Sequence, residues 1–157
     1  MKTITETDHP YSAAGRVWIL PSYNLTRLPD GTLVVSQAEL DRVHRAISNE
    51  ICGSGDRLTV EELDFLCAVT LSTYVDVAAA LGLNKSTVSR WRRPGKVPGG
   101  ATSAALKRWF WTLLFSDSMG GLAVPVELLQ EDARVLEFLH RRAIEEGAAE
   151  RVLRRVA

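Results

Sequence analysis

The sequence has few residues that bind metals tightly. It contains two cysteines, Cys52 and Cys67, which do not form a Cys-X-X-Cys pair, and three histidines scattered along the chain. A structural zinc site needs four such ligands at short, paired spacings. A chain of 157 residues also buries enough surface to fold without a metal or a disulfide. We therefore expect no metal and no cofactor.

Long apolar runs are missing as well. No stretch reaches the roughly 18 apolar residues of a membrane-spanning helix, and residues 1–15 lack the apolar core of a secretory signal. The sequence therefore predicts no membrane association. A reducing cytoplasmic location is expected.

Net charge is also absent, because 19 basic residues balance 19 acidic ones. This balance excludes a uniformly basic nucleic-acid binder and an acidic tail protein. The charge is unevenly placed, however: residues 77–116 carry seven bases and no acid, while residues 1–76 carry eleven acids and six bases. Such a local basic segment indicates a polyanionic partner, with a solvated basic surface as the alternative.

Turn and capping signals divide the chain into four segments. They are a flexible arm (1–16), a β-hairpin plus helix (17–52), a helix-turn-helix domain (58–116) and a C-terminal helical region (117–157). Pro29-Asp30-Gly31 predicts the turn of a small hairpin over residues 25–35. The expected fold class is mainly α, a λ-repressor-like helix-turn-helix domain with a small N-terminal β-hairpin and a C-terminal helical extension.

Helix starts and stops follow from residues that cap or break helices. Ser36 with Glu39, and Thr59 with Glu62, have the spacing of capping boxes. The expected helices after the second box cover residues 74–81, 84–92, 103–115 and 125–146, with a short helix after residue 147 and a break at Pro94. In the 103–115 helix, Leu106, Trp109, Phe110, Leu113 and Leu114 form the expected inner stripe.

The segment from Tyr74 to Arg93 carries the most specific pattern in the chain. Two short helices that cross at a steep angle need a small residue at the crossing and a turn residue that tolerates positive φ. Ala78 and Gly82 meet these needs in the same register as the predicted helix break. The inward apolar positions are Val77, Leu81, Leu83, Val88 and Trp91. The pattern predicts a DNA-binding helix-turn-helix, with an αα-hairpin of no DNA role as the alternative.

The second helix of such a unit enters the major groove. The residues expected to contact base edges are Lys85, Ser86, Ser89 and Arg90. Those expected to contact the DNA backbone are Thr73, Tyr74, Asn84, Thr87, Arg92, Arg93 and Lys96.

This motif resembles the helix-turn-helix of Xre/phage-repressor regulators. From about residue 30 to residue 115, the runs DGTLVVSQAEL, LTVEELDFL, LGLNKSTVSRWRR and ALKRWFWTLL resemble the DNA-binding half of MqsA (YgiT)-type antitoxins. The chain lacks the paired CxxC motifs of that family's zinc domain, and it has Arg92 where the family often has Glu. The resemblance implies an autorepressor that binds an inverted repeat near its own promoter.

A single helix-turn-helix reads few base pairs, so a homodimer on a palindromic operator in double-stranded DNA is expected. The residues expected at the dimer interface are Trp111, Phe115, Leu129, Leu136 and Leu139. In the alternative arrangement, the last helix folds back over Trp111 within one chain.

The sequence predicts a sequence-specific DNA-binding transcriptional regulator. It contains no catalytic cluster that would indicate an enzyme. An antitoxin or phage-type inhibitor is the main alternative, with a toxin or another protein as its chief partner through the C-terminal helices. A targeting subunit of a nucleic-acid enzyme is a further one.

Overall fold

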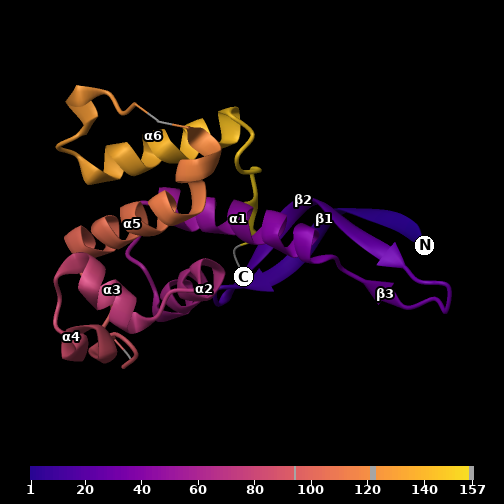
Figure 1. The fold of residues 1–157 in the computed structure, drawn as a ribbon, viewed down its shortest axis with the longest axis horizontal. Helices are drawn as coiled ribbons and strands as arrows, with labels where there is room; N and C mark the ends of the chain where they lie inside the picture. The colour runs from indigo at the N-terminus through magenta and orange to yellow at the C-terminus, as the bar shows by residue number, and fades with distance from the viewer. Residues whose placement is uncertain (94, 121–122, 156–157) are drawn as a thin grey trace.

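A computed structural model describes residues 1–93, 95–120 and 123–155. A long hairpin extends to one side, and α1 runs from its base into the opposite end, where the other helices lie (Figure 1). In chain order the described elements are β1 (Lys2–Ala13), β2 (Arg16–Arg27), β3 (Leu33–Val34), α1 (Gln37–Gly53), α2 (Val60–Thr70), α3 (Tyr74–Leu81), α4 (Lys85–Arg90), α5 (Gly100–Met119), the 3₁₀ helix η1 (Val126–Leu128), α6 (Asp132–Glu145) and β4 (Leu153–Arg155).

The fold class is mixed α/β, and the prediction of a mainly α fold is wrong. Six α-helices accompany a four-stranded antiparallel sheet in the described part of the chain. Residues 1–16, expected to be a flexible arm, contain β1, which pairs with β2 along its length from Lys2↔Arg27 to Ala13↔Arg16. The turn predicted at Pro29-Asp30-Gly31 joins β2 to the much shorter β3.

The inward face of β1 is unusual because it is made of mixed residue types. Ile4 and Glu6 are partly covered on one side of Asp8, and His9 and Tyr11 on the other. The covered positions therefore change from even to odd numbers at Asp8, where φ is +49°. A strand is normally recognised by strict alternation of apolar residues, and β1 does not have it.

The end of the chain also differs from expectation. In place of one long helix over 125–146, η1 is followed by the shorter α6. In place of a short helix after residue 147, the chain continues to β4, which pairs with Val17–Ile19 of β2. Val152, just before β4, is buried, so the final segment is anchored in the core.

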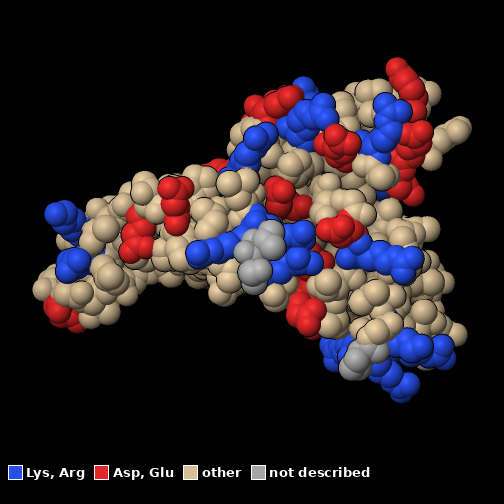
Figure 2. All heavy atoms as spheres, turned by 180° about the vertical axis from the view of Figure 1, so that it is seen from behind, with Lys and Arg blue, Asp and Glu red and all other residues tan. Residues whose placement is uncertain are grey.

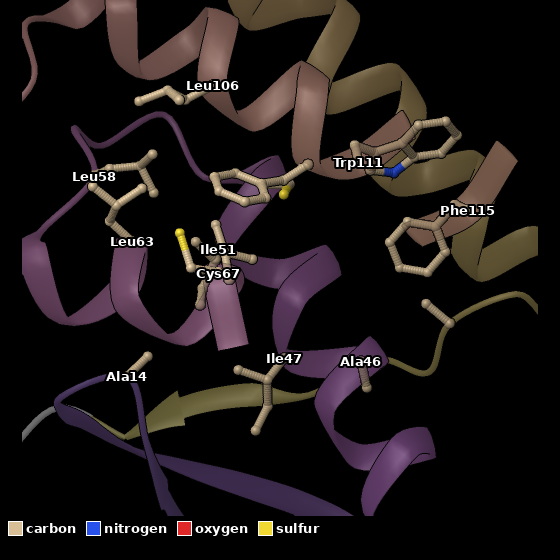
Figure 3. Close-up of a cluster of buried hydrophobic side chains, with 14 of the residues drawn as sticks. Ala14, Ala46, Ile47, Ile51, Leu58, Leu63, Cys67, Leu106, Trp111 and Phe115 are labelled. Atoms are coloured by element: carbon tan, nitrogen blue, oxygen red, sulfur yellow. The ribbon is translucent and has the colours of Figure 1, made fainter. Parts of the chain in front are cut away.

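The core is centred on α1 and α5, with α6 packed across both (Figures 1 and 3). Because α5 contacts α1, α2 and α3 on one side and α6 on another, it is buried on more than one face. Leu106 and Phe110 are buried as expected. Leu113, assigned to the inner stripe, is 50% exposed, whereas Trp111 and Phe115 are buried.

This packing corrects the expected dimer interface. Trp111, Phe115, Leu136 and Leu139 are buried within the chain's own core, and only Leu129 is exposed. The structure therefore has the alternative arrangement, in which the last helix folds back over Trp111. In this packing those four residues are not exposed to a partner chain.

Polar side chains fix the hairpin to α1. Ser36 caps α1 by accepting from the Glu39 backbone N–H, but the Glu39 carboxylate does not reach back to complete a capping box. It accepts instead from the backbone N–H of Asn24 on β2, at 2.9 Å. Arg42 pairs with Glu39 at 2.5 Å and with Glu150 near the chain end. This network joins the sheet, α1 and the C-terminal segment.

In the described ranges, no single helix is long and apolar enough to cross a membrane. Helices α2 and α3 together reach that length and composition, but they are bent by 96° at their break.

Candidate nucleic-acid interface

Helices α3 and α4 are two short helices joined by a turn at Gly82, and α3 has the bounds that the sequence predicts. Thr73 and Asp76 make a complete capping box at the start of α3. Gly82 ends α3 with φ +64°, in the left-handed region that glycine adopts at little cost. Pro94, expected to break the chain after α4, lies outside the described residues.

The inward side of this unit is apolar. Val77 and Val88 are fully buried, and Ala78, within α3, is 6% exposed. Trp91 is 7% exposed, so it belongs to the core and is not presented for stacking on a ligand. Leu81 and Leu83 are partly buried. These contacts hold α4 against α3 and leave its other side to solvent.

The outward side of α4 is polar and basic. All four residues predicted to contact base edges are exposed: Lys85, Ser86, Ser89 and Arg90. Figure 2 shows Lys and Arg side chains gathered at this end of the molecule, at the lower right. The arrangement can place hydrogen-bond donors and hydroxyl groups against base edges in a major groove.

The residues predicted to contact the DNA backbone surround this face, but their states differ. Arg93 and Lys96 are exposed after α4. Asn84 is exposed and precedes α4 without a side-chain capping bond, so its amide is free to bind a phosphate. Thr87 is partly buried, and the Thr73 hydroxyl is occupied because it donates to Asp76 at 3.0 Å.

Tyr74 and Arg92 lie together at the edge of this face. The Arg92 guanidinium is 4.1 Å from the centre of the Tyr74 ring. The Tyr74 hydroxyl donates to Asp64 on α2 at 2.5 Å. Burial and this bond to Asp64 raise the pKa of Tyr74 to about 12. Sequence reasoning missed Asp64, because nothing local in the sequence links it to a tyrosine ten residues later.

Two bases of the 77–116 segment do not belong to the interface. Lys107 is 3% exposed, and its Nζ donates to the backbone carbonyl oxygens of Ser54 and Asp56, at 2.6 and 2.5 Å. Arg108 pairs with Asp132 of α6 at 2.7 Å. The five bases left near α4 are Lys85, Arg90, Arg92, Arg93 and Lys96.

Two kinds of ligand site could lie away from α3 and α4: a cavity and a metal-binding cluster. A cavity of about 980 Å³ lies between the β1–β2 turn, the start of α2 and β4, and no residue of α3 or α4 lines it. Among the residues that the structure describes, no group of three or more His, Cys, Asp or Glu side chains is placed to hold a metal ion.

Comparison with known proteins adds no identification. No protein-family model matches the chain, and no similar curated protein or solved structure is found.

Proposed function

We propose that this chain is a sequence-specific DNA-binding transcriptional regulator that reads base edges with α4. The observation that carries the proposal is the exposed side of α4. It presents two hydroxyl residues and two bases, Ser86, Ser89, Lys85 and Arg90, on a helix held by a buried apolar contact with α3. Arg and Lys read guanine O6 and N7, and serine can serve either donor or acceptor edges.

The charge around α4 supports the same proposal. Arg92, Arg93 and Lys96 continue from the end of α4 and are exposed. Bases beside a recognition helix neutralise phosphates and release counterions, which adds affinity without adding base preference. The neutral total charge of the chain leaves this end as a local basic surface.

The finer parts of the proposal concern assembly and regulation. We propose that two copies bind an inverted repeat upstream of the chain's own gene and repress it, as the resemblance to MqsA-type regulators implies. The two free cysteines fit a reducing cytoplasmic location. The two α4 helices of such a dimer would lie about 34 Å apart, or a multiple of that spacing, on one side of the DNA. The buried residues of α5 and α6 do not form its interface in this packing.

The test is selection of binding sites from a random duplex library, followed by footprinting on the DNA upstream of the gene. We expect one motif with two-fold symmetry to be enriched and the same motif to be protected upstream. The Arg90→Ala variant is carried through the same selection. Enrichment of no motif by the wild-type chain would contradict base reading by α4.

A protein partner is the second candidate, and exposed apolar residues support it. In the C-terminal region Val126 is 77% exposed and Leu129 48% exposed, and Leu113 on α5 is exposed as well. Single exposed apolar residues are common, so the observation is weaker than that for α4. Co-expression with the neighbouring reading frame and co-purification would test an antitoxin role. Loss of the complex in Val126→Asp and Leu129→Asp would assign it to this region.

A further inference from the structure

Three side chains, from α2, from α3 and from the turn after α4, form a connected set beside α4. Tyr74, at the start of α3, donates a hydrogen bond from its hydroxyl group to Asp64 on α2. The Arg92 guanidinium lies over the Tyr74 ring. Tyr74 is partly buried and Arg92 is exposed. The set therefore links a fixed ring to a cation at the surface.

The phenol hydroxyl of Tyr74 is already committed. A tyrosine has one O–H donor, and here it points to the Asp64 carboxylate at 2.5 Å. A DNA phosphate accepts hydrogen bonds and offers no proton in return, so it would have to displace Asp64 to receive this one. The bond to Asp64 therefore disfavours the direct contact between the Tyr74 hydroxyl and the DNA backbone that the sequence predicts.

The Arg92 guanidinium is in the opposite situation. The guanidinium lies over the ring, and a hydrogen bond with Tyr74 raises the pKa of Arg92. Because a guanidinium has five N–H donors, this contact restrains it and leaves other donors for a phosphate. A free arginine at a protein surface loses much rotamer freedom when it binds a phosphate, and holding it beforehand reduces that loss. Among the described contacts, no carboxylate lies within salt-bridge distance of Arg92.

We propose that Tyr74 is a positioning residue, whose ring holds Arg92 ready for a DNA phosphate and whose bond to Asp64 fixes the ring. The inference rests on the proposed function, since it assigns one phosphate contact within it. It changes the role of Tyr74 from a contact to a support, and it adds Asp64, an acid, to the DNA-binding machinery.

The experiment is a double-mutant cycle on one selected duplex at constant salt. The variants are Tyr74→Leu, Arg92→Ala and the double variant, with Tyr74→Phe as the conservative change and Arg93→Ala as the matched control for loss of one base. An NMR measurement of the ring-current shift on the Arg92 side chain reports stacking without DNA. Thermal melting of each variant reports whether it folds.

We expect Tyr74→Leu to weaken binding about two- to fivefold, the range of an exposed cation–π contact, and to remove the ring-current shift. In the Arg92→Ala background the same change is expected to have no effect. Tyr74→Phe keeps the ring but loses the bond to Asp64 that fixes it, so it is expected to weaken binding by about twofold or less and to reduce the ring-current shift only in part. In the Arg93→Ala background Tyr74→Leu is expected to keep its full effect.

Two results would overturn the positioning role while leaving the proposed function intact. One is Tyr74→Phe as damaging as Arg92→Ala, which would assign the hydroxyl a direct contact. The other is Tyr74→Leu equally damaging with and without Arg92. If Tyr74→Leu does not fold, Tyr74→Phe and the ring-current shift decide. If the wild-type chain binds no duplex at all, the proposed function and this inference both fail.

Discussion

Lys107 shows that a basic residue in a basic segment can serve the fold and not a ligand. Its Nζ lies under the segment after α1 and donates to two backbone carbonyl groups. Burial lowers its pKa. Composition counts it with Lys85 and Arg90, but only the structure shows which bases are accessible to a polyanion.

The variant Lys107→Met is expected to lower the free energy of unfolding by about 1–3 kcal/mol, because two carbonyl groups lose a charged donor. It is expected to leave the salt dependence of DNA binding unchanged. The matched control is Lys96→Met, at an exposed position, which is expected to change stability by less than about 0.5 kcal/mol and to reduce the salt slope. Urea denaturation and a salt series of binding titrations measure the two effects. A reduced salt slope with unchanged stability in Lys107→Met would show that Lys107 contacts DNA.

Cys52 provides a pH-dependent test of the core. Burial raises the pKa of its thiol from 9.0 to about 12. Between these values the unfolded chain releases the thiol proton and the folded chain keeps it, so the free energy of unfolding falls as the pH rises. This thiol alone contributes a slope of about 1.4 kcal/mol per pH unit in that window.

The measurement is urea denaturation at about pH 8 and about pH 10.5, for the wild type and Cys52→Ala. The difference in stability between the two proteins is expected to narrow at the higher pH, because only the wild type loses this contribution. A difference that stays constant over this window would show that the thiol ionises alike in both states and is not buried as described.

Arg90 tests base reading at the level of one side chain. Arg90→Ala is expected to cost about 1–3 kcal/mol on the selected site and to relax base preference at one position. Arg93→Ala is expected to weaken binding to selected and unrelated duplexes alike. Equal losses on both duplexes for Arg90→Ala would place Arg90 on a phosphate.

At the scale of elements, α2 and α3 end in the same backbone conformation with different residues. Leu71 ends α2 with φ +55°, and Gly82 ends α3 with φ +64°. The leucine side chain is 90% exposed and gains little from packing. A side chain in the left-handed region costs energy that glycine avoids.

Leu71→Gly is therefore expected to raise the free energy of unfolding by about 1 kcal/mol. Gly82→Ala is the reciprocal change. A Cβ at Gly82 meets no atom within 4 Å, so its expected loss of about 1 kcal/mol comes from the backbone alone. Thermal or chemical denaturation measures both. Destabilisation by Leu71→Gly would mean that Leu71 makes a contact outside the described structure.

The elements that sequence reasoning placed well are those with local signals. The capping box of Thr73 and the glycine at 82 fix both ends of α3, and the small Ala78 is buried on its inner side. These signals act within a few residues, so they can be read without knowing the rest of the fold. The four proposed base-contacting residues were placed on the exposed side of α4 for the same reason.

The elements that were missed depend on contacts distant in sequence. β4 is three residues long and exists because it pairs with β2 more than 130 positions earlier. The buried faces of α5 depend on α6 as well as on α1, so a single inner stripe could not be read from its own sequence. β1 was missed because Glu6 and His9 occupy inward positions that usually hold apolar residues.

At the scale of the whole molecule, α6 completes the core. It packs against α5, where Val135 and Leu139 lie beside Trp111. Trp111, Phe115, Val135, Leu139 and Ala143 are all buried. A chain truncated after Asp117 would expose these aromatic side chains to water. It is expected to lose cooperative unfolding and to aggregate, as seen by circular dichroism melting and by light scattering during size-exclusion chromatography.

A folded, monomeric truncated chain with an unchanged melting temperature would show that α6 is not part of this core. The full-length chain is expected to run as a dimer in the same light-scattering measurement, through a surface other than the buried faces of α5 and α6. The Arg90→Ala variant is the control, because loss of a base contact leaves the oligomeric state unchanged.

The most direct test of the account is the affinity of the full-length chain for a selected duplex and for a scrambled one of equal length, measured by fluorescence anisotropy over a series of salt concentrations. The account predicts binding to the selected duplex about 10³-fold tighter or more. It also predicts a steep fall of affinity with salt, whose slope decreases by about 1 in Arg93→Ala. Equal affinity for the two duplexes, or affinity that does not respond to salt, would contradict DNA reading by α4.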